Sequence, residues 1–108
     1  MAKKLYYENL YQFEAALDNR DFKITSGIVE GILDAMFKNR ALAHIFEVSF
    51  ADGSDVYYLS LNKKEWAETL RRCLPDYEKK ELYEKCAEIK RAVDSLEVVE
   101  KPKRLRSK

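Results

Sequence analysis

The sequence predicts a small α+β domain in the order α-α-β-β-α-α, with one antiparallel β-hairpin packed against about four helices. Three observations predict this class. Stretches on both sides of the centre repeat their apolar residues every three or four positions, as amphipathic helices do. Two central runs are rich in β-branched and aromatic residues and are separated by an Asp-Gly turn. Three glycines and two prolines among 108 residues leave most of the chain to regular structure.

An apolar stripe marks the first predicted helix, with spacings of four, three and four residues: Tyr6, Leu10, Phe13 and Leu17. A second helix is expected over 26–40, where apolar residues form a broad surface. Gly27 and Gly31 lie within it, and each costs about 1 kcal/mol relative to alanine inside a helix. The close approach of another element would offset that cost.

The centre of the chain, 44–61, predicts the hairpin. Its first strand alternates, with four residues on one face and three on the other: His44, Phe46, Val48 and Phe50, against Ile45, Glu47 and Ser49. The sequence "ADGSD" then supplies a turn, and "VYYLSL" a second strand. Since a two-stranded hairpin is marginally stable alone, it must lie against the helices or pair with a second copy. A homodimer through the hairpin edge is therefore one expected assembly.

Two more helices and a tail are expected after the hairpin. Asn62 caps a helix that should end at Pro75, because the residue before a proline disfavours helical geometry. The last helix should span 76–97. In the final eight residues, "KPKRLRSK", five are basic and none is acidic, whereas the preceding hundred carry a net charge of −4. We therefore expect one globular domain over 1–98 and a disordered basic tail over 99–108.

The segment 79–93 includes "LYEKCAEIKRAV", which resembles the UVR motif of nucleotide-excision-repair subunits and of some protein-quality-control adaptors. Cys86 stands where the motif has its first alanine, Lys90 where it has arginine, and Arg91 where it has aspartate. The resemblance covers about twenty residues and implies a helix pair that docks on another protein. The altered charged positions put a shared partner in doubt.

Little in the sequence indicates catalysis, so the chain is predicted not to be an enzyme and to need no cofactor. His44 could serve as a base for Cys73 or Cys86, but a lone histidine at a strand edge is more often structural. The two cysteines do not have zinc-site spacing, and no phosphate-binding glycine loop is present. Cys73 and Cys86 are expected to be reduced thiols in a cytoplasmic protein. No signal peptide or apolar run of about 18 residues is visible, so no membrane association is expected.

Two functions stay open. The first is binding to another protein, as an adaptor or as a steric inhibitor of an enzyme, in the style of bacteriophage and mobile-element accessory proteins. Its candidate residues offer aromatic and apolar surface: Tyr7, Tyr11, Tyr57 and Leu59. The alternative is a nucleic-acid accessory protein that combines exposed tyrosines with basic residues: Arg71, Arg72, Lys101, Lys103, Arg104 and Arg106.

Overall fold

The computed structural model describes residues 3–53 and 55–106, and the side chains of these as far as Glu97. Contacts divide the chain into two compact units, 1–63 and 64–108, and each is described by itself. The predicted α+β class is confirmed. The predicted order was wrong, because a strand precedes the first helix and the sheet of the first unit has three strands.

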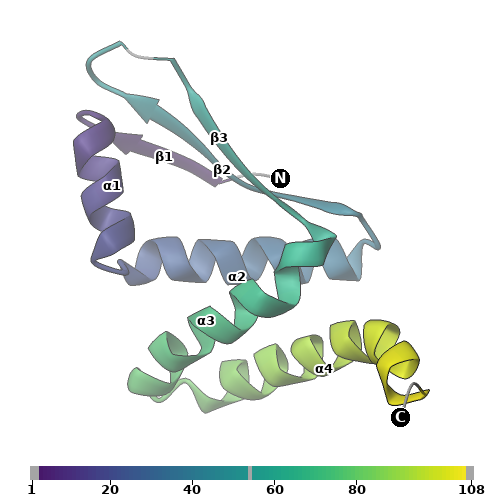
Figure 1. Cartoon of the computed structure of the whole chain (residues 1–108). Coiled ribbons are helices and arrows are strands. Elements are labelled where there is room, and N and C mark those ends of the chain that lie inside the picture. Colours follow the sequence, from purple (N-terminus) through teal and green to yellow (C-terminus); the bar gives the residue numbers. More distant parts are fainter. Residues whose placement is uncertain (1–2, 54, 107–108) are drawn as a thin grey trace. The chain divides into compact units, whose positions relative to one another are not determined.

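The first unit is a mixed sheet with two helices in one crossover connection (Figure 1). Its elements are, in chain order, β1 (Lys3–Tyr7), α1 (Leu10–Asp18), α2 (Phe22–Phe37), β2 (Leu42–Phe50) and β3 (Tyr57–Asn62). Strand β2 is central, parallel to β1 and antiparallel to β3. The crossover through α1 and α2 is what a parallel pair requires, because a tight turn can join only antiparallel strands.

Strand β1 replaces the first turns of the predicted first helix. The side chain of Asn9 caps α1 by accepting a hydrogen bond from the Gln12 N–H at 3.0 Å. Gln12 Oε1 in turn accepts from the Glu8 N–H at 2.9 Å. This reciprocal pair is a variant of the capping box, which fixes a helix start. Tyr6 and Tyr7 therefore lie before the helix, where Tyr6 pairs with Ser49 and Tyr7 with Phe50.

A β-bulge in β2 breaks the alternation that the sequence predicts. The register against β3 shifts between His44, which pairs with Ser60, and Phe46, which pairs with Leu59. Ile45 and Phe46 are adjacent, yet both are buried. A β-bulge inserts one extra residue into a strand. Two consecutive side chains can then lie on the same face, and the alternation between the two faces restarts one position later. His44 consequently lies on the face opposite Phe46, which corrects the prediction that the two share a face.

Helix α2 packs directly on β2 through its two glycines. A Cβ at Gly27 would lie 2.5 Å from Phe46 Cζ, and one at Gly31 would lie 2.7 Å from Ile45 Cδ1. A methyl group at Gly27 would require the Phe46 ring to move, and one at Gly31 would require the end of the flexible Ile45 side chain to move. The expected close approach of another element to the two glycines is confirmed, and that element is the bulged segment of β2.

Helices α1 and α2 end in the same backbone motif, and so does α3 (Trp66–Lys79) of the second unit. Residues with positive φ follow the three helices: Arg20 (54°), Asn39 (60°) and Glu81 (59°). After α3, the Leu82 N–H donates to the Tyr77 carbonyl at 3.1 Å and the Glu81 N–H to the Glu78 carbonyl at 3.0 Å. This is the Schellman pattern, which usually uses glycine. Because no glycine follows these helices, the end of α3 near Lys80 was not predicted from the sequence.

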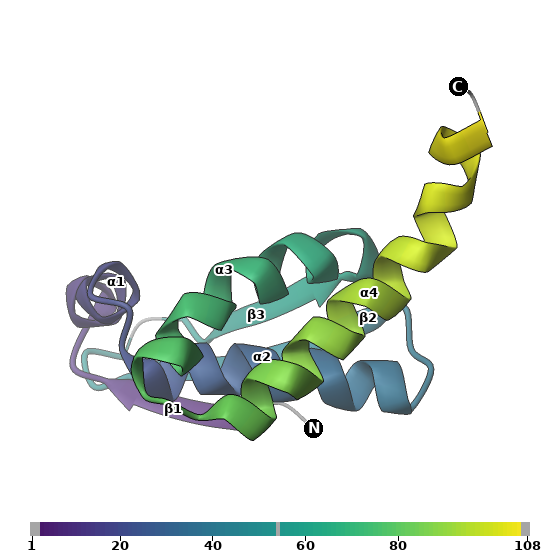
Figure 2. The ribbon, with the colours of Figure 1, turned by 90° about the horizontal axis from the view of Figure 1, so that it is seen from below.

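The second unit is a helical hairpin of α3 and α4 (Tyr83–Arg106), which lie side by side in both ribbon views (Figures 1 and 2). A short 3-10 turn, η1 (Lys63–Glu65), leads into it. The predicted end of a helix at Pro75 was wrong, since α3 continues four residues beyond it. Cys73 and Tyr77, on either side of the proline, are both buried, and their packing offsets the hydrogen bond that proline cannot donate.

Helix α4 begins seven residues later than expected and runs to Arg106, beyond the predicted end at Glu97. Of the predicted tail, 107–108 lie outside the described residues. Among residues 3–53 and 55–106, no helix is long and apolar enough to cross a membrane.

Candidate binding surfaces

The sheet of the first unit has two unlike faces. Paired residues on neighbouring strands share a face, so the pairing assigns each side chain. The face against α2 carries Phe46 and Val48, which are buried. The opposite face, called the open face below, carries exposed and half-buried residues from all three strands: Lys4, Tyr6, Leu42, His44, Glu47, Ser49, Tyr58, Ser60 and Asn62. Tyr6 and Tyr58 are its largest side chains, and they are 68% and 67% exposed.

A hollow of about 660 Å³ lies partly on the open face and is called the Tyr58 hollow. It is lined by residues of β2, β3 and the α2–β2 connection: Lys38, Arg40, His44, Phe46, Glu47, Tyr58 and Ser60. Within it, His44 Nδ1 and Ser60 Oγ are 3.2 Å apart, a hydrogen bond across the bulge. The hollow thus joins two aromatic rings, those of Phe46 and Tyr58, with two hydroxyl groups, an imidazole, two cationic side chains and the Glu47 carboxylate.

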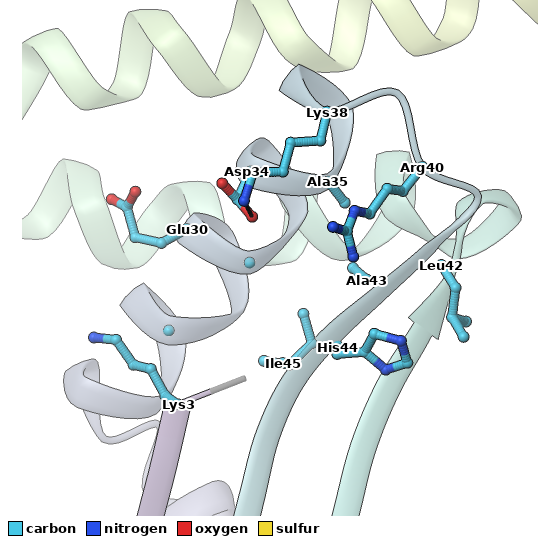
Figure 3. Close-up of a pocket in the computed structure, with 12 residues that line it drawn as sticks. Lys3, Glu30, Asp34, Ala35, Lys38, Arg40, Leu42, Ala43, His44 and Ile45 are labelled. Atoms are coloured by element: carbon cyan, nitrogen blue, oxygen red, sulfur yellow. Dashed lines mark ion pairs between the residues drawn. The ribbon is translucent and has the colours of Figure 1, made fainter. Parts of the chain in front are cut away.

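A smaller groove of about 320 Å³ runs between α2 and the first half of β2 (Figure 3). It shares Lys38, Arg40 and His44 with the Tyr58 hollow. In Figure 3, Ile45 points towards α2 and His44 points to the other side of β2, as the bulge requires. The α2–β2 connection therefore supplies cationic side chains to both hollows at once.

The two cations of this connection differ in their partners. Lys38 Nζ is 3.4 Å from Asp34 Oδ2, one turn back on α2. Arg40 is exposed, and within residues 3–53 and 55–97 no carboxylate forms an ion pair with it. A guanidinium without a protein carboxylate can accept an anion from outside, often in a bidentate arrangement.

The sheet also has two unlike edges. Strand β1, "KKLYY", carries lysines at its first two positions. Strand β3, "YYLSLN", has no charged residue and no proline. Edge strands that stay single are usually protected by charge, proline or a bulge, because their outward N–H and C=O groups can pair with another chain. Within the described part of the first unit, β3 lacks the first two of these protections.

The predicted protein-binding residues are only partly brought together. Tyr7 and Tyr57 flank the buried ring of Phe13, with centroids 5.4 and 5.7 Å away. Leu59 shares the α2-facing side of β3 with Tyr57 and is half-buried. Tyr11 lies on α1 and is 81% exposed. Tyr7 and Tyr11 are thus in different elements, a strand and a helix, rather than on one helix flank as expected.

In the aromatic group of Tyr7, Phe13 and Tyr57, the phenol of Tyr7 has a shifted pKa. Partial burial beside Phe13 raises the pKa of its phenol above the usual value of 10.0, and the negative charge of Asp21 raises it further. Tyr7 accordingly remains protonated and uncharged at neutral pH.

The predicted nucleic-acid-binding residues lie on the second unit. Arg71 forms ion pairs with Glu68 and Glu97, and Arg72 with Glu68. These carboxylates neutralise much of the charge that phosphate would otherwise attract. The other candidates fall on α4, at positions whose side chains lie outside the described residues: Lys101, Lys103, Arg104 and Arg106.

Other residue types that could carry chemistry are dispersed. Cys73 and Cys86 are buried thiols without a disulfide, and His44 is exposed on β2. Within the described residues, no group of three or more His, Cys, Asp or Glu side chains could hold a metal ion.

Tyr6, Arg40 and Tyr58 were not among the candidate binding residues predicted from the sequence. Tyr6 was assigned to a helical core stripe, and the signal against this was "Asn-x-x-Gln" at 9–12, which starts the helix later. The residues of β3 around Tyr58 alternate in exposure. The sequence does not indicate which of the two faces a helix covers.

No family model matches this chain, and no curated protein or solved structure was found to be similar to it.

Proposed function

We propose that the chain is a non-enzymatic protein-binding module that adds an extended segment of another protein to the edge of β3. The observation that supports this is the absence of charge and proline from β3, beside an opposite edge that begins with Lys3 and Lys4. Strand addition gains affinity from main-chain hydrogen bonds and specificity from alternate side-chain contacts. An adaptor or an inhibitor could use this mode.

The pairing of β3 indicates which amides would take part. The Lys63 N–H donates to the Ala41 carbonyl at 3.0 Å, towards β2. Since successive backbone N–H groups of a strand point to opposite sides, those of Tyr58 and Ser60 point away from β2. An added segment would contact Tyr57 and Leu59 on one face. Tyr57 is 45% exposed and Leu59 is half-buried, so each still has surface to offer.

The test compares two substitutions at one position. Ser60→Pro removes an outward N–H, whereas Ser60→Thr keeps it along with the hydroxyl group that contacts His44. Proteins captured from the cells of origin by the wild-type chain should also bind Ser60→Thr and should be lost with Ser60→Pro. In the complex, hydrogen exchange at the amides of Tyr58 and Ser60 should slow. Partners that bind Ser60→Pro as well as wild type, or that leave these amides unprotected, would contradict strand addition.

A further inference from the structure

We infer that the open face of the sheet binds single-stranded nucleic acid, with a base stacked on Tyr58 and a phosphate held by Arg40. This goes beyond the proposed edge pairing: it uses side chains of a face, whereas edge pairing uses backbone groups of β3.

Two exposed aromatic rings lie on the open face. Tyr6 and Tyr58 are about two-thirds exposed and lie on the two outer strands, on the same face. Protein surfaces for unpaired bases use such rings, since every base has a face that can stack on an aromatic side chain. A duplex hides its base faces, so these tyrosines favour a single strand.

A cation without a carboxylate partner lies beside one of these rings. Arg40 lines the same hollow as Tyr58, and within residues 3–53 and 55–97 no carboxylate forms an ion pair with it. Lys38 of the same hollow is paired with Asp34, and the hollow also contains the Glu47 carboxylate. The volume of about 660 Å³ falls in the range of small-molecule sites and suits one nucleotide unit. A base on the ring and a phosphate on the guanidinium would occupy the two ends of one hollow.

The rest of the open face is mostly polar. Glu47 and Ser49 of β2 lie between Tyr58 and Tyr6, and Leu42 is the one aliphatic residue assigned to this face, so the face has no broad apolar patch. His44 and Ser60 can exchange hydrogen bonds with a sugar or a base edge. Glu47 is the one carboxylate among the open-face residues, and it is paired in register with Lys4 on one side and with Tyr58 on the other.

The experiment measures fluorescence anisotropy of labelled 12-residue oligo(U) and oligo(dT) with the full chain, at 50 and 200 mM salt. Tyr58→Ala should weaken binding roughly 5- to 150-fold, the equivalent of about 1–3 kcal/mol for one stacked base, and leave the salt dependence unchanged. Tyr58→Phe should bind like wild type. Arg40→Ala should weaken binding and lower the slope of log K against log salt by about 0.7, the loss of one phosphate contact.

Tyr83→Ala is the matched control, because Tyr83 is 65% exposed but lies on α4 of the second unit. It should bind as wild type does. Comparison of the two oligonucleotides separates RNA from DNA, and preference for either one supports the inference. The inference would be overturned by absence of binding at 50 mM salt or by equal effects of Tyr58→Ala and Tyr83→Ala. Binding that is lost on deletion of 101–108 and unaffected by Tyr58→Ala would overturn it as well.

Discussion

The two faces of the three-stranded sheet are made by alternate residues of the same strands, yet they do different things. On the α2 face, Phe46 and Val48 are buried under a helix whose glycines lie close to Phe46 and Ile45. On the open face, Tyr58 and Tyr6 are mostly exposed among polar neighbours. The difference teaches that aromatic content alone does not identify a binding surface, because a ring stabilises the fold on one face and is available to a ligand on the other.

The largest expected effect of a substitution is on the α2 face. Phe46→Ala should lower the free energy of unfolding by about 3–5 kcal/mol, because it removes a buried ring and leaves a cavity below α2. Urea denaturation followed by circular dichroism measures this change. A loss below about 1 kcal/mol would mean that the contact between α2 and β2 contributes little to stability.

A smaller loss is expected when α2 is pushed away from the sheet. Gly27→Ala places a methyl group against the Phe46 ring, at a cost of about 1–3 kcal/mol. This exceeds the gain of about 1 kcal/mol from better helix propensity, so the variant should be less stable than wild type. In the background of Phe46→Leu, which gives the methyl group room, Gly27→Ala should cost much less. Equal costs in both backgrounds would disprove the close contact.

On the open face, substitution should hardly change stability. Tyr6→Ala and Tyr58→Ala should each alter the free energy of unfolding by about 0.5 kcal/mol or less, since both rings are largely exposed. The same denaturation curves measure the effect. A loss comparable to that of Phe46→Ala would show that these rings stabilise the fold and would remove the distinction between the faces.

The smallest effect concerns Tyr7, at the boundary of the α2 face. Because the pKa of its phenol is raised in the folded protein, its contribution to stability is complete below the unfolded value of 10.0 and is lost as pH rises through the folded value. Alkaline denaturation of Tyr7→Phe should therefore begin at higher pH than that of wild type. Ultraviolet titration of the phenolates, compared between these two proteins, reports the Tyr7 midpoint directly.

Much of the local structure could be predicted from sequence because its causes are local. The Asp-Gly turn and the β-rich runs beside it specified the hairpin that became β2 and β3. The predicted glycine contact in the second helix is also present, since glycine in a helix needs a close neighbour. The start of α1 was predictable too, from Asn9 and Gln12, and was missed because the apolar spacing from Tyr6 was given more weight.

The candidate site was far less predictable. The exposure of Tyr58 and Tyr6 depends on which face of the sheet α2 covers. The position of the Arg40 side chain depends on the path of the α2–β2 connection. The predicted tyrosine pair, Tyr7 and Tyr11, was instead divided between β1 and α1. Neither hydrophobic spacing nor composition carries this information.

By itself, the sequence determined that the chain is α+β, where the hairpin turns and which helix needs a close neighbour. These features arise from interactions over a few residues, such as turn geometry and helical periodicity. Tertiary structure alone decided that Lys3 pairs with Phe46, that the bulge sends His44 and Phe46 to opposite faces, and that β3 forms an edge. Such pairings join residues far apart in the chain, and packing against α2 selects among registers that local preferences leave equivalent.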